Sequence, residues 1–323
     1  MTAEQPPSAG GIPVGISACL LGREVRHDGG HKHSRYCTGV LSRYFDFQPL
    51  CPELEAGLGV PRPAIHLRER DGNLHVTETR GEADHTAAMD AAIARALPGL
   101  AHLRGYILMA KSPSCGMDRI KVHNADGQVV RRDGRGRFAE ALMAAYPLMP
   151  VEEEGRLNDD GLRENFIERV FAYDDWRQNV AGDQLSARSL IAFHTRHKFQ
   201  LLAHSEKHYR QLGPLLSDLK AAPLADIAGR YLEGFMAAMA RQVSRGAHMN
   251  AMLHLLGYLK GTMPEADKTV LLEQIEAYRR GEVPLVVPMT LLRMAQRREP
   301  VDYLRVQQYL APYPDELGLR NRV

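Results

Sequence analysis

The sequence has no uninterrupted run of about 18 apolar residues, the length that a membrane-spanning helix needs. Residues 1–11 lack the positive start and apolar stretch of a secretory signal peptide, and they contain several proline and glycine residues. The formal net charge is only +2, which argues against a chain that binds polyanions over its whole surface. We therefore expect a cytoplasmic protein without a membrane span and with a disordered leader over residues 1–11.

Cysteine is scarce and unevenly placed. The chain has four cysteines, and all of them precede residue 116. Because the cytosol keeps thiols reduced, a disulfide framework is not expected. The sequence also lacks the paired Cys-x-x-Cys spacing of most structural zinc sites. Two interpretations remain for the cysteines: a shared chemical role, or burial as small apolar side chains.

The first half of the 323-residue chain alternates short apolar runs with helical patterns. This alternation is typical of a mostly parallel sheet, so we predict a Rossmann-like α/β N-terminal domain over residues 12–155. An Asp71-Gly72 pair within residues 65–79 predicts a hairpin at its edge. The other expected strands are 13–21, 45–50, 105–109 and 146–151, and the expected helices are 84–97 and 137–145.

From residue 156 onward the apolar residues follow helical spacing. Glycine, proline and aspartate separate the helical segments. We predict an all-α C-terminal domain over residues 156–323, with its main helices at 158–180, 190–202, 227–244, 249–261, 265–280 and 289–296.

Cys19, Cys51 and Cys115 each lie at or just beyond the end of a predicted strand. In open α/β sheets the loops at the carboxyl ends of strands meet in one crevice, so these thiols are expected to converge. Scattered cysteines suit an iron–sulfur cluster, and three protein ligands leave one iron open as a Lewis acid. Cys37 lies inside a helical pattern and is expected to serve in packing. Structural burial of all four cysteines is the alternative.

Two polar groups stand beside these cysteines. Glu53, in Cys-Pro-Glu, is placed either to move protons at a metal site or to interact with a helix dipole. Ser112 and Ser114 precede Cys115, and their hydroxyls serve either a substrate or the turn itself.

A basic loop follows the first cysteine. It carries Arg23, Arg26, His31 and Lys32 around a Gly29-Gly30 pair, which lets the backbone approach a ligand closely. We consider these four residues candidates for binding a substrate phosphate. An ordinary basic surface loop is the alternative.

Together these segments resemble the thiouracil desulfidase family. The resemblance covers roughly residues 12–155 and rests on ISACLLG (16–22), DGGHK (28–32), CPE (51–53) and SPSCG (112–116). It implies a [4Fe–4S] cluster held by Cys19, Cys51 and Cys115, and a non-redox exchange of thiocarbonyl sulfur for oxygen. It also assigns catalysis to Glu53 and to a serine of the Ser112/Ser114 turn, of which we favour Ser112.

The second half resembles a helical domain of uncharacterised function that is often fused to this desulfidase. The fused form implies action on 4-thiouracil, 4-thiouridine or its monophosphate, with 2-thiouracil as an alternative and nucleotides from tRNA breakdown as a source. RNA contact is one hypothesis for a basic and aromatic cluster in this half, and zinc binding by His204 and His208 is another. The cluster comprises His194, Lys198, His204, Lys207, His208 and Tyr209. The competing functions are a cluster- or zinc-containing RNA-associated protein and a cluster-dependent hydro-lyase.

Overall fold

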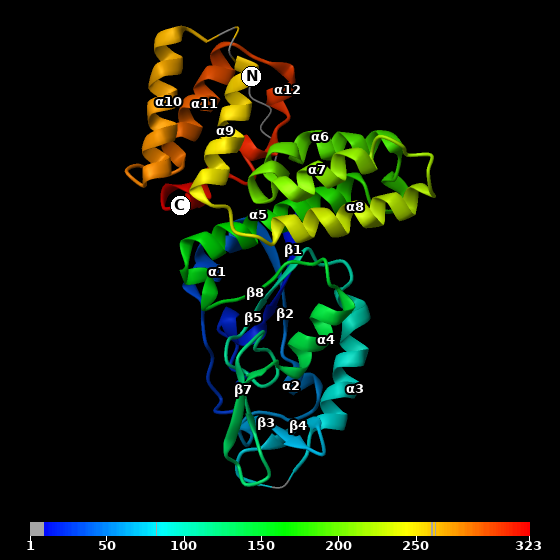
Figure 1. Cartoon of the computed structure of the whole chain (residues 1–323). Coiled ribbons are helices and arrows are strands. Elements are labelled where there is room, and N and C mark those ends of the chain that lie inside the picture. Colours follow the sequence, from blue (N-terminus) through cyan, green and yellow to red (C-terminus); the bar gives the residue numbers. More distant parts are fainter. Residues whose placement is uncertain (1–9, 82, 260, 262) are drawn as a thin grey trace. The chain divides into compact units, whose positions relative to one another are not determined.

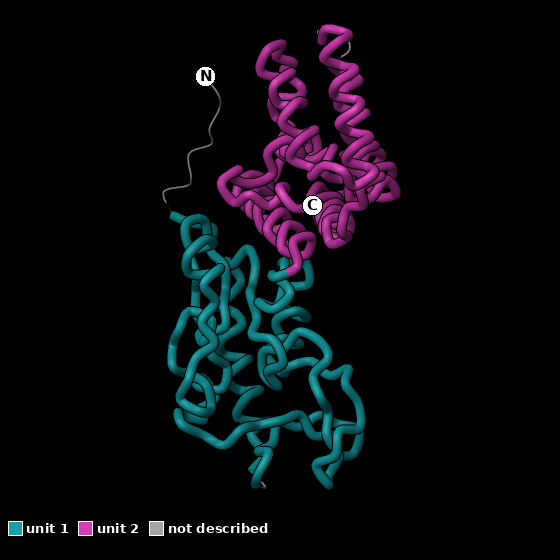
Figure 2. Tube along the Cα trace, turned by 90° about the vertical axis from the view of Figure 1, so that its left-hand side faces the viewer, with its two compact units in different colours: residues 1–158 teal, residues 159–323 magenta. Residues whose placement is uncertain are grey.

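The computed structural model describes residues 10–81, 83–259, 261 and 263–323. It divides into two compact units, residues 1–158 and residues 159–323 (Figure 2). Residues 1–9 of the expected leader lie outside the described residues. Within the described part of the chain, no helix is long and apolar enough to cross a membrane.

A parallel four-stranded sheet forms the centre of the first unit, with the strands in the order β2-β1-β5-β8 (Figure 1). Its middle strands are buried except for the partly exposed Pro13, as Val14, Ile16 and Ile107 show, because helices and loops cover both faces. The arrangement confirms the predicted α/β fold with a parallel sheet. The strands are β1 (Ile12–Ser17), β2 (Phe45–Leu50), β5 (Gly105–Leu108) and β8 (Val151–Glu153).

Four α-helices accompany this sheet: α1 (Arg35–Gly39), α2 (Pro52–Glu55), α3 (Thr86–Ala96) and α4 (Arg137–Ala145). Figure 1 shows α3 and α4 on one side of the sheet and α1 on the other. Gly15 on β1 allows close packing, because a Cβ there would lie 2.2 Å from Cδ2 of Tyr106 on β5. The Tyr106 ring in turn meets Phe138 of α4, with ring centroids 5.5 Å apart.

A second four-stranded sheet, in the order β4-β3-β6-β7, was not expected from the sequence. The predicted hairpin is present as β3 (Ile65–Arg70) and β4 (Asn73–Glu78), but it belongs to this sheet. Its other strands are β6 (Ile120–His123) and β7 (Val129–Gly134). The sequence did not predict these two strands, because β6 is short and most of β7 is exposed. Neither therefore shows a long alternation of apolar and polar residues.

Two predicted strands have different limits in the structure. The apolar run that begins at residue 13 leaves the sheet after Ser17, and Ala18–Leu21 form a 3₁₀ turn that ends at Gly22 with φ +84°. The last strand is Val151–Glu153 rather than 146–151, because α4 extends to Ala145 and a turn follows it.

The second unit is helical, as predicted. The described helices are α5 (Asp160–Asn179), α6 (Ala187–His204), α7 (Glu206–Leu215), α8 (Leu224–Met239), α9 (Arg245–Leu259), α10 (Glu265–Arg280), α11 (Val286–Arg298) and α12 (Asp302–Arg305). Trp176, Phe193, Tyr231 and Phe235 form an aromatic core among α5, α6 and α8. A second core joins α6 to α9, α10 and α11.

The interior of the second unit contains a chain of polar side chains. Gln200 bridges His197 and Glu168, and Glu168 also bonds to Nε2 of His204. His204 is only 7% exposed, and its Nδ1 bonds to the carbonyl of Arg241. Both ring nitrogens are therefore used, which removes His204 from the surface cluster proposed for RNA and from the His204/His208 zinc hypothesis.

Candidate functional site

The carboxyl ends of β1, β2 and β5 meet at a cavity of about 550 Å³ in the first unit. Cys19 lies in the turn after β1, Cys51 directly follows β2, and Cys115 lies in the loop after β5. All three line this cavity. Ser17 pairs with Leu50 in the sheet, so the loops that carry Cys19 and Cys51 leave adjacent strands at the same level.

Local backbone contacts fix the two later cysteines. Cys51 precedes α2, whose first residue, Pro52, is suited to a helix start. The Ser112 hydroxyl accepts hydrogen bonds from the N–H groups of Ser114 and Cys115, at 3.2 and 3.1 Å. A Cβ at Gly136 would lie 2.6 Å from the Ser114 backbone, so only glycine permits this packing. The turn before Cys115 is therefore held from both sides.

The three thiols are close enough to influence one another. Burial, together with the neighbouring Cys51, raises the pKa of Cys19 to about 11. Burial also raises the pKa of Cys51 and, most strongly, that of Cys115, which senses both other cysteines. Clustered thiols with raised pKa values become thiolates readily only when a cation compensates the charge, as an iron–sulfur cluster does.

Glu53 is held at the same cavity by two side chains. Arg62 donates to Oε2 of Glu53 from Nε at 2.9 Å and from Nη2 at 2.5 Å. The buried hydroxyl of Ser114 donates to Oε1 at 2.9 Å. The carboxylate thus has one fixed orientation and keeps lone pairs for a further donor.

Arg62 is itself locked in place. Its side chain is 3% exposed, and it donates to the carbonyls of Gly59 and Val25 at 2.6 and 3.0 Å. Sequence reasoning missed Arg62, because it belongs to no motif and only the folded loop brings it to Glu53.

Among the described residues, no three His, Cys, Asp or Glu side chains come close enough to hold a single metal ion. A cubane cluster is larger and joins thiolates that are too far apart to share one ion. The donor set of three thiols suits iron–sulfur chemistry. The Tyr106 hydroxyl is buried and has no hydrogen-bond partner among the described residues. Burial raises the pKa of Tyr106 well above its usual value, and the thiols of Cys115, Cys51 and Cys19 act in the same direction. This unused donor is consistent with an iron–sulfur cluster at the three thiols, because the sulfur atoms of a cluster accept hydrogen bonds.

The basic loop contributes only some of its predicted residues to the cavity. Arg26 and Lys32 line it, whereas Arg23 and His31 are exposed and lie outside its lining. Lys111, which sequence reasoning did not select, also lines the cavity and has a left-handed backbone with φ +60°. Such strain in a non-glycine residue is typical of functional sites.

Cys37 behaves differently from the other cysteines. It lies in α1, is fully buried and does not line the cavity. This position agrees with the packing role expected from the sequence.

Comparisons with known proteins follow the same division of the chain. Residues 14–154 match the family model described as 2-thiouracil desulfurase, and residues 198–314 match a protein of unknown function, DUF1722. The uncharacterized protein YbgA of Escherichia coli (strain K12) is 29% identical over 154 residues, which cover 47% of this chain and 90% of that protein. A solved structure, the [4Fe-4S]-dependent thiouracil desulfidase TudS, is 32% identical, with coverage of 46% of this chain and 94% of that chain and a TM-score of 0.38.

The two family models together match most of the chain, in the order expected from its motifs. The residues around the cysteine cavity all lie within or directly beside the first match. Through this first domain, which is followed by a DUF1722 domain, the chain belongs to the thiouracil desulfidase family.

Proposed function

We propose that this thiouracil desulfidase binds a [4Fe–4S] cluster through Cys19, Cys51 and Cys115 and replaces the sulfur of a thiolated pyrimidine with oxygen. The observation that carries the proposal is the position of Glu53. Its carboxylate lines the same cavity as the three cysteines and is fixed by Arg62 and Ser114. The site therefore combines thiolate ligands with a positioned base.

The reaction is a hydrolysis without net oxidation. Water supplies the oxygen that replaces sulfur at the ring carbon, and sulfur leaves as hydrogen sulfide. When bound, the cluster supplies a soft Lewis acid that accepts sulfur. Glu53 takes a proton from the attacking water, while Arg62 keeps the carboxylate oriented. Ser114 donates to Glu53, and Ser112 holds the turn that carries Cys115.

The charge of the cavity supports a substrate that carries phosphate. Arg26, Lys32 and Lys111 line the cavity together with Arg62, which is paired with Glu53. The lining also contains Glu154, and Arg26 lies 3.6 Å from Asp28, so the cations outnumber the carboxylates by two in the lining and Lys32 and Lys111 are the candidates for an anion. Because a free base has no anion for these side chains, we infer that 4-thiouridine monophosphate is preferred over the free bases 4-thiouracil and 2-thiouracil.

Anaerobic reconstitution with iron and sulfide, followed by a sulfide-release assay, tests the proposal. Cys19→Ala, Cys51→Ala and Cys115→Ala should lose the cluster absorbance and all sulfide release. Cys37→Ala is the matched control, since it removes a buried thiol outside the cavity and should keep both.

Three other outcomes would contradict the proposal. Full turnover without iron would exclude the cluster's role. A cluster that releases no sulfide but dehydrates hydroxy acids would favour the hydro-lyase. A cluster without turnover, together with RNA affinity, would favour an RNA-associated binding protein.

A further inference from the structure

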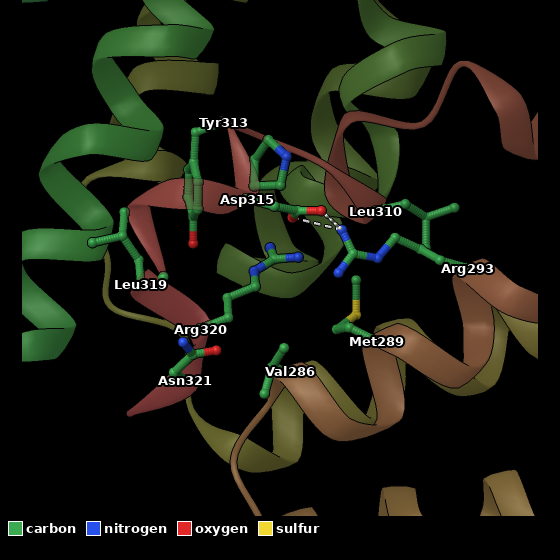
Figure 3. Close-up of a pocket in the computed structure, with 11 residues that line it drawn as sticks. Val286, Met289, Arg293, Leu310, Tyr313, Asp315, Leu319, Arg320 and Asn321 are labelled. Carbon is green, nitrogen blue, oxygen red and sulfur yellow. Dashed lines mark hydrogen bonds and ion pairs between the residues drawn. The ribbon is translucent and has the colours of Figure 1, made fainter. Parts of the chain in front are cut away.

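Two cavities of the structure differ in whether their charged groups are already paired. A cavity of about 140 Å³ in the helical unit carries two guanidinium groups (Figure 3). Arg293 is bonded to Asp315 and Arg320 to Glu164, so neither cation needs a ligand. The larger cysteine cavity contains the carboxylate of Glu154, and no cation of the described residues lies within ion-pair distance of it. Glu154 can therefore still receive a donor from a ligand.

Glu154 is held at the carboxyl end of the sheet by the loop that follows β5. It comes directly after β8, and its backbone N–H donates to the carbonyl of Leu108 at 3.0 Å. Its Oε2 accepts a hydrogen bond from the N–H of Ala110 at 2.8 Å. The preceding N–H of this loop, that of Met109, donates to the hydroxyl of Ser17 on β1 at 2.9 Å. The loop is thus tied to β1 and to Glu154, which fixes the carboxylate beside the strand ends.

The second carboxylate oxygen of Glu154 is left for a ligand. Oε1 forms no hydrogen bond with the described residues, and the side chain lines the cysteine cavity. Burial and the neighbouring Cys51 raise the pKa of Cys19, and the charge of Glu154 adds to their effect, so the carboxylate lies near the Cys19 thiol. An ionised carboxylate accepts hydrogen bonds and donates none. It therefore selects a ligand group that carries an N–H or O–H.

Glu154 and Glu53 reach the cysteine cavity from opposite edges of the parallel sheet. The strands lie in the order β2-β1-β5-β8, so β2 and β8 are the edge strands. Glu53 follows β2 and Glu154 follows β8, whereas Cys19 and Cys115 follow the two central strands. A ring bound at the cysteines therefore meets Glu53 from one side and Glu154 from the other.

We propose that Glu154 recognises the ring N–H beside the thiocarbonyl group of the substrate. The inference rests on the proposed function, because a thiolated uracil has an N–H bonded directly to its C=S carbon. When the sulfur is directed at the cysteines, this N–H points to the side and donates to Oε1 of Glu154. The other neighbour of the carbon in 4-thiouracil is a C–H group, which cannot satisfy a carboxylate. Glu154 thus fixes the orientation of the ring and selects uracil-type rings over cytosine-type rings, whose corresponding nitrogen has no proton.

Calorimetry on the reconstituted full-length protein tests this recognition without turnover. The probes are uridine monophosphate, which has the ring N–H, and 3-methyluridine monophosphate and cytidine monophosphate, which lack it. The wild type should bind uridine monophosphate at least about tenfold more tightly than the other two, since they lose a charge-assisted hydrogen bond. Equal binding of the three overturns the proposal. So does a lack of binding by uridine monophosphate at up to about 20 mM, a range that covers millimolar sites.

Glu154→Gln removes the charge with little change in shape. Its single amide oxygen should stay with the N–H of Ala110, because a buried donor without an acceptor is unfavourable. The NH₂ group then faces the ring N–H, so uridine monophosphate should bind about tenfold more weakly. Cytidine monophosphate has an acceptor at that position and should bind as tightly as uridine monophosphate or more tightly. A structural defect would weaken both nucleotides, whereas the proposed role exchanges the preference between them.

A control and two contrasting outcomes separate this inference from the proposed function. Glu24→Gln removes the same charge from an exposed position of the basic loop outside the cavity lining and should keep the wild-type preference. A preference that depends on Glu154, without sulfide release from any thiopyrimidine, would support recognition of the ring N–H and contradict the proposed reaction. Normal sulfide release by Glu154→Gln, with an unchanged preference among the three probes, would overturn the role of Glu154 and leave the proposed reaction intact.

Discussion

The guanidinium of Arg62 holds the carboxylate of Glu53 through two hydrogen bonds to one oxygen, at 2.9 and 2.5 Å. Because Arg62 is also bonded to two backbone carbonyls, it cannot follow Glu53 if the latter rotates. The pair therefore fixes the direction in which the free lone pairs of Glu53 point. Arg62 acts as a positioning residue for the proposed base.

Arg62→Lys should lower kcat about 10–100-fold, because a misplaced base loses its alignment with the attacked atom. A lysine supplies one point charge in place of the rigid fork. KM and the cluster absorbance should stay near the wild-type values. Arg95→Lys is the control. Arg95 donates to the carbonyl of Glu55, the last residue of the helix α2 that carries Glu53, but the Arg95 side chain is exposed. An equal loss in both variants would indicate a structural effect only.

Replacing Ser114 and replacing Ser112 should have different effects, the first on kcat and the second on the stability of the turn. Ser114→Ala removes the hydroxyl that donates to Glu53, so kcat should fall about 10-fold or more without loss of iron. Ser112→Ala removes the acceptor of two backbone N–H groups and should destabilise the turn by about 1 kcal/mol. Iron retention after gel filtration and sulfide release distinguish them. Iron loss in Ser114→Ala with normal turnover per cluster would reverse this assignment.

Apolar patterning predicted the parallel sheet and the long helices, because buried runs such as Val14–Ile16 and the stripes of α10 are local features. The second sheet was missed for a physical reason. Exposed β7 residues such as Val130 gain their strand conformation from pairing with β6, and no local pattern encodes that partner.

The same distinction explains the candidate site. Cys19, Cys51 and Cys115 were selected because strand ends of a parallel sheet share one edge, which is a rule about topology. Arg62 obeys no such rule. It reaches Glu53 only after the loop that follows α2 has folded back and closed on the carbonyl of Val25.

Tyr106→Phe should shift the reduction potential of the protein that holds a cluster, but it should not destabilise the protein without a cluster. Without a cluster, removing a buried hydroxyl that bonds to none of the described residues should leave the stability unchanged or raise it. With a cluster, the loss of a donor should make the reduction potential more negative, since hydrogen bonds to sulfur set that potential. Anaerobic redox titration measures the shift. Identical potentials in the two proteins would show that the phenol does not contact the cluster.

The buried Glu168–His204 pair should make the stability of the helical unit depend on pH. Burial alone would raise the pKa of Glu168, but His204, with help from Arg320 and Gln200, lowers it below its usual value. Burial alone would lower the pKa of His204, but the charge of Glu168 raises it. A raised histidine pKa stabilises fully below the unfolded value of about 6.5, and this contribution is lost as pH rises through the folded pKa.

His204→Gln should therefore cost about 3 kcal/mol near pH 6 and less at high pH, where the wild type has already lost its charge. Urea unfolding followed by the fluorescence of Trp176, the single tryptophan, reports on this unit. His254→Gln, at an exposed position of α9, is the control and should show no such trend. A pH-independent cost for His204→Gln would mean that the pair is not ionised.

The choice between nucleotide and free base should be decided by the cations of the cysteine cavity. Lys32→Gln should raise KM for 4-thiouridine monophosphate about tenfold, since it removes a charge-assisted contact to phosphate. It should leave KM for 4-thiouracil unchanged, because that base carries no anion. Arg23→Gln, from the same loop but outside the cavity lining, is the matched control for net charge. If both variants raise KM equally, general attraction by the basic loop explains the preference. If KM rises for the free base as well, Lys32 contacts the ring, and the phosphate must be bound by other residues.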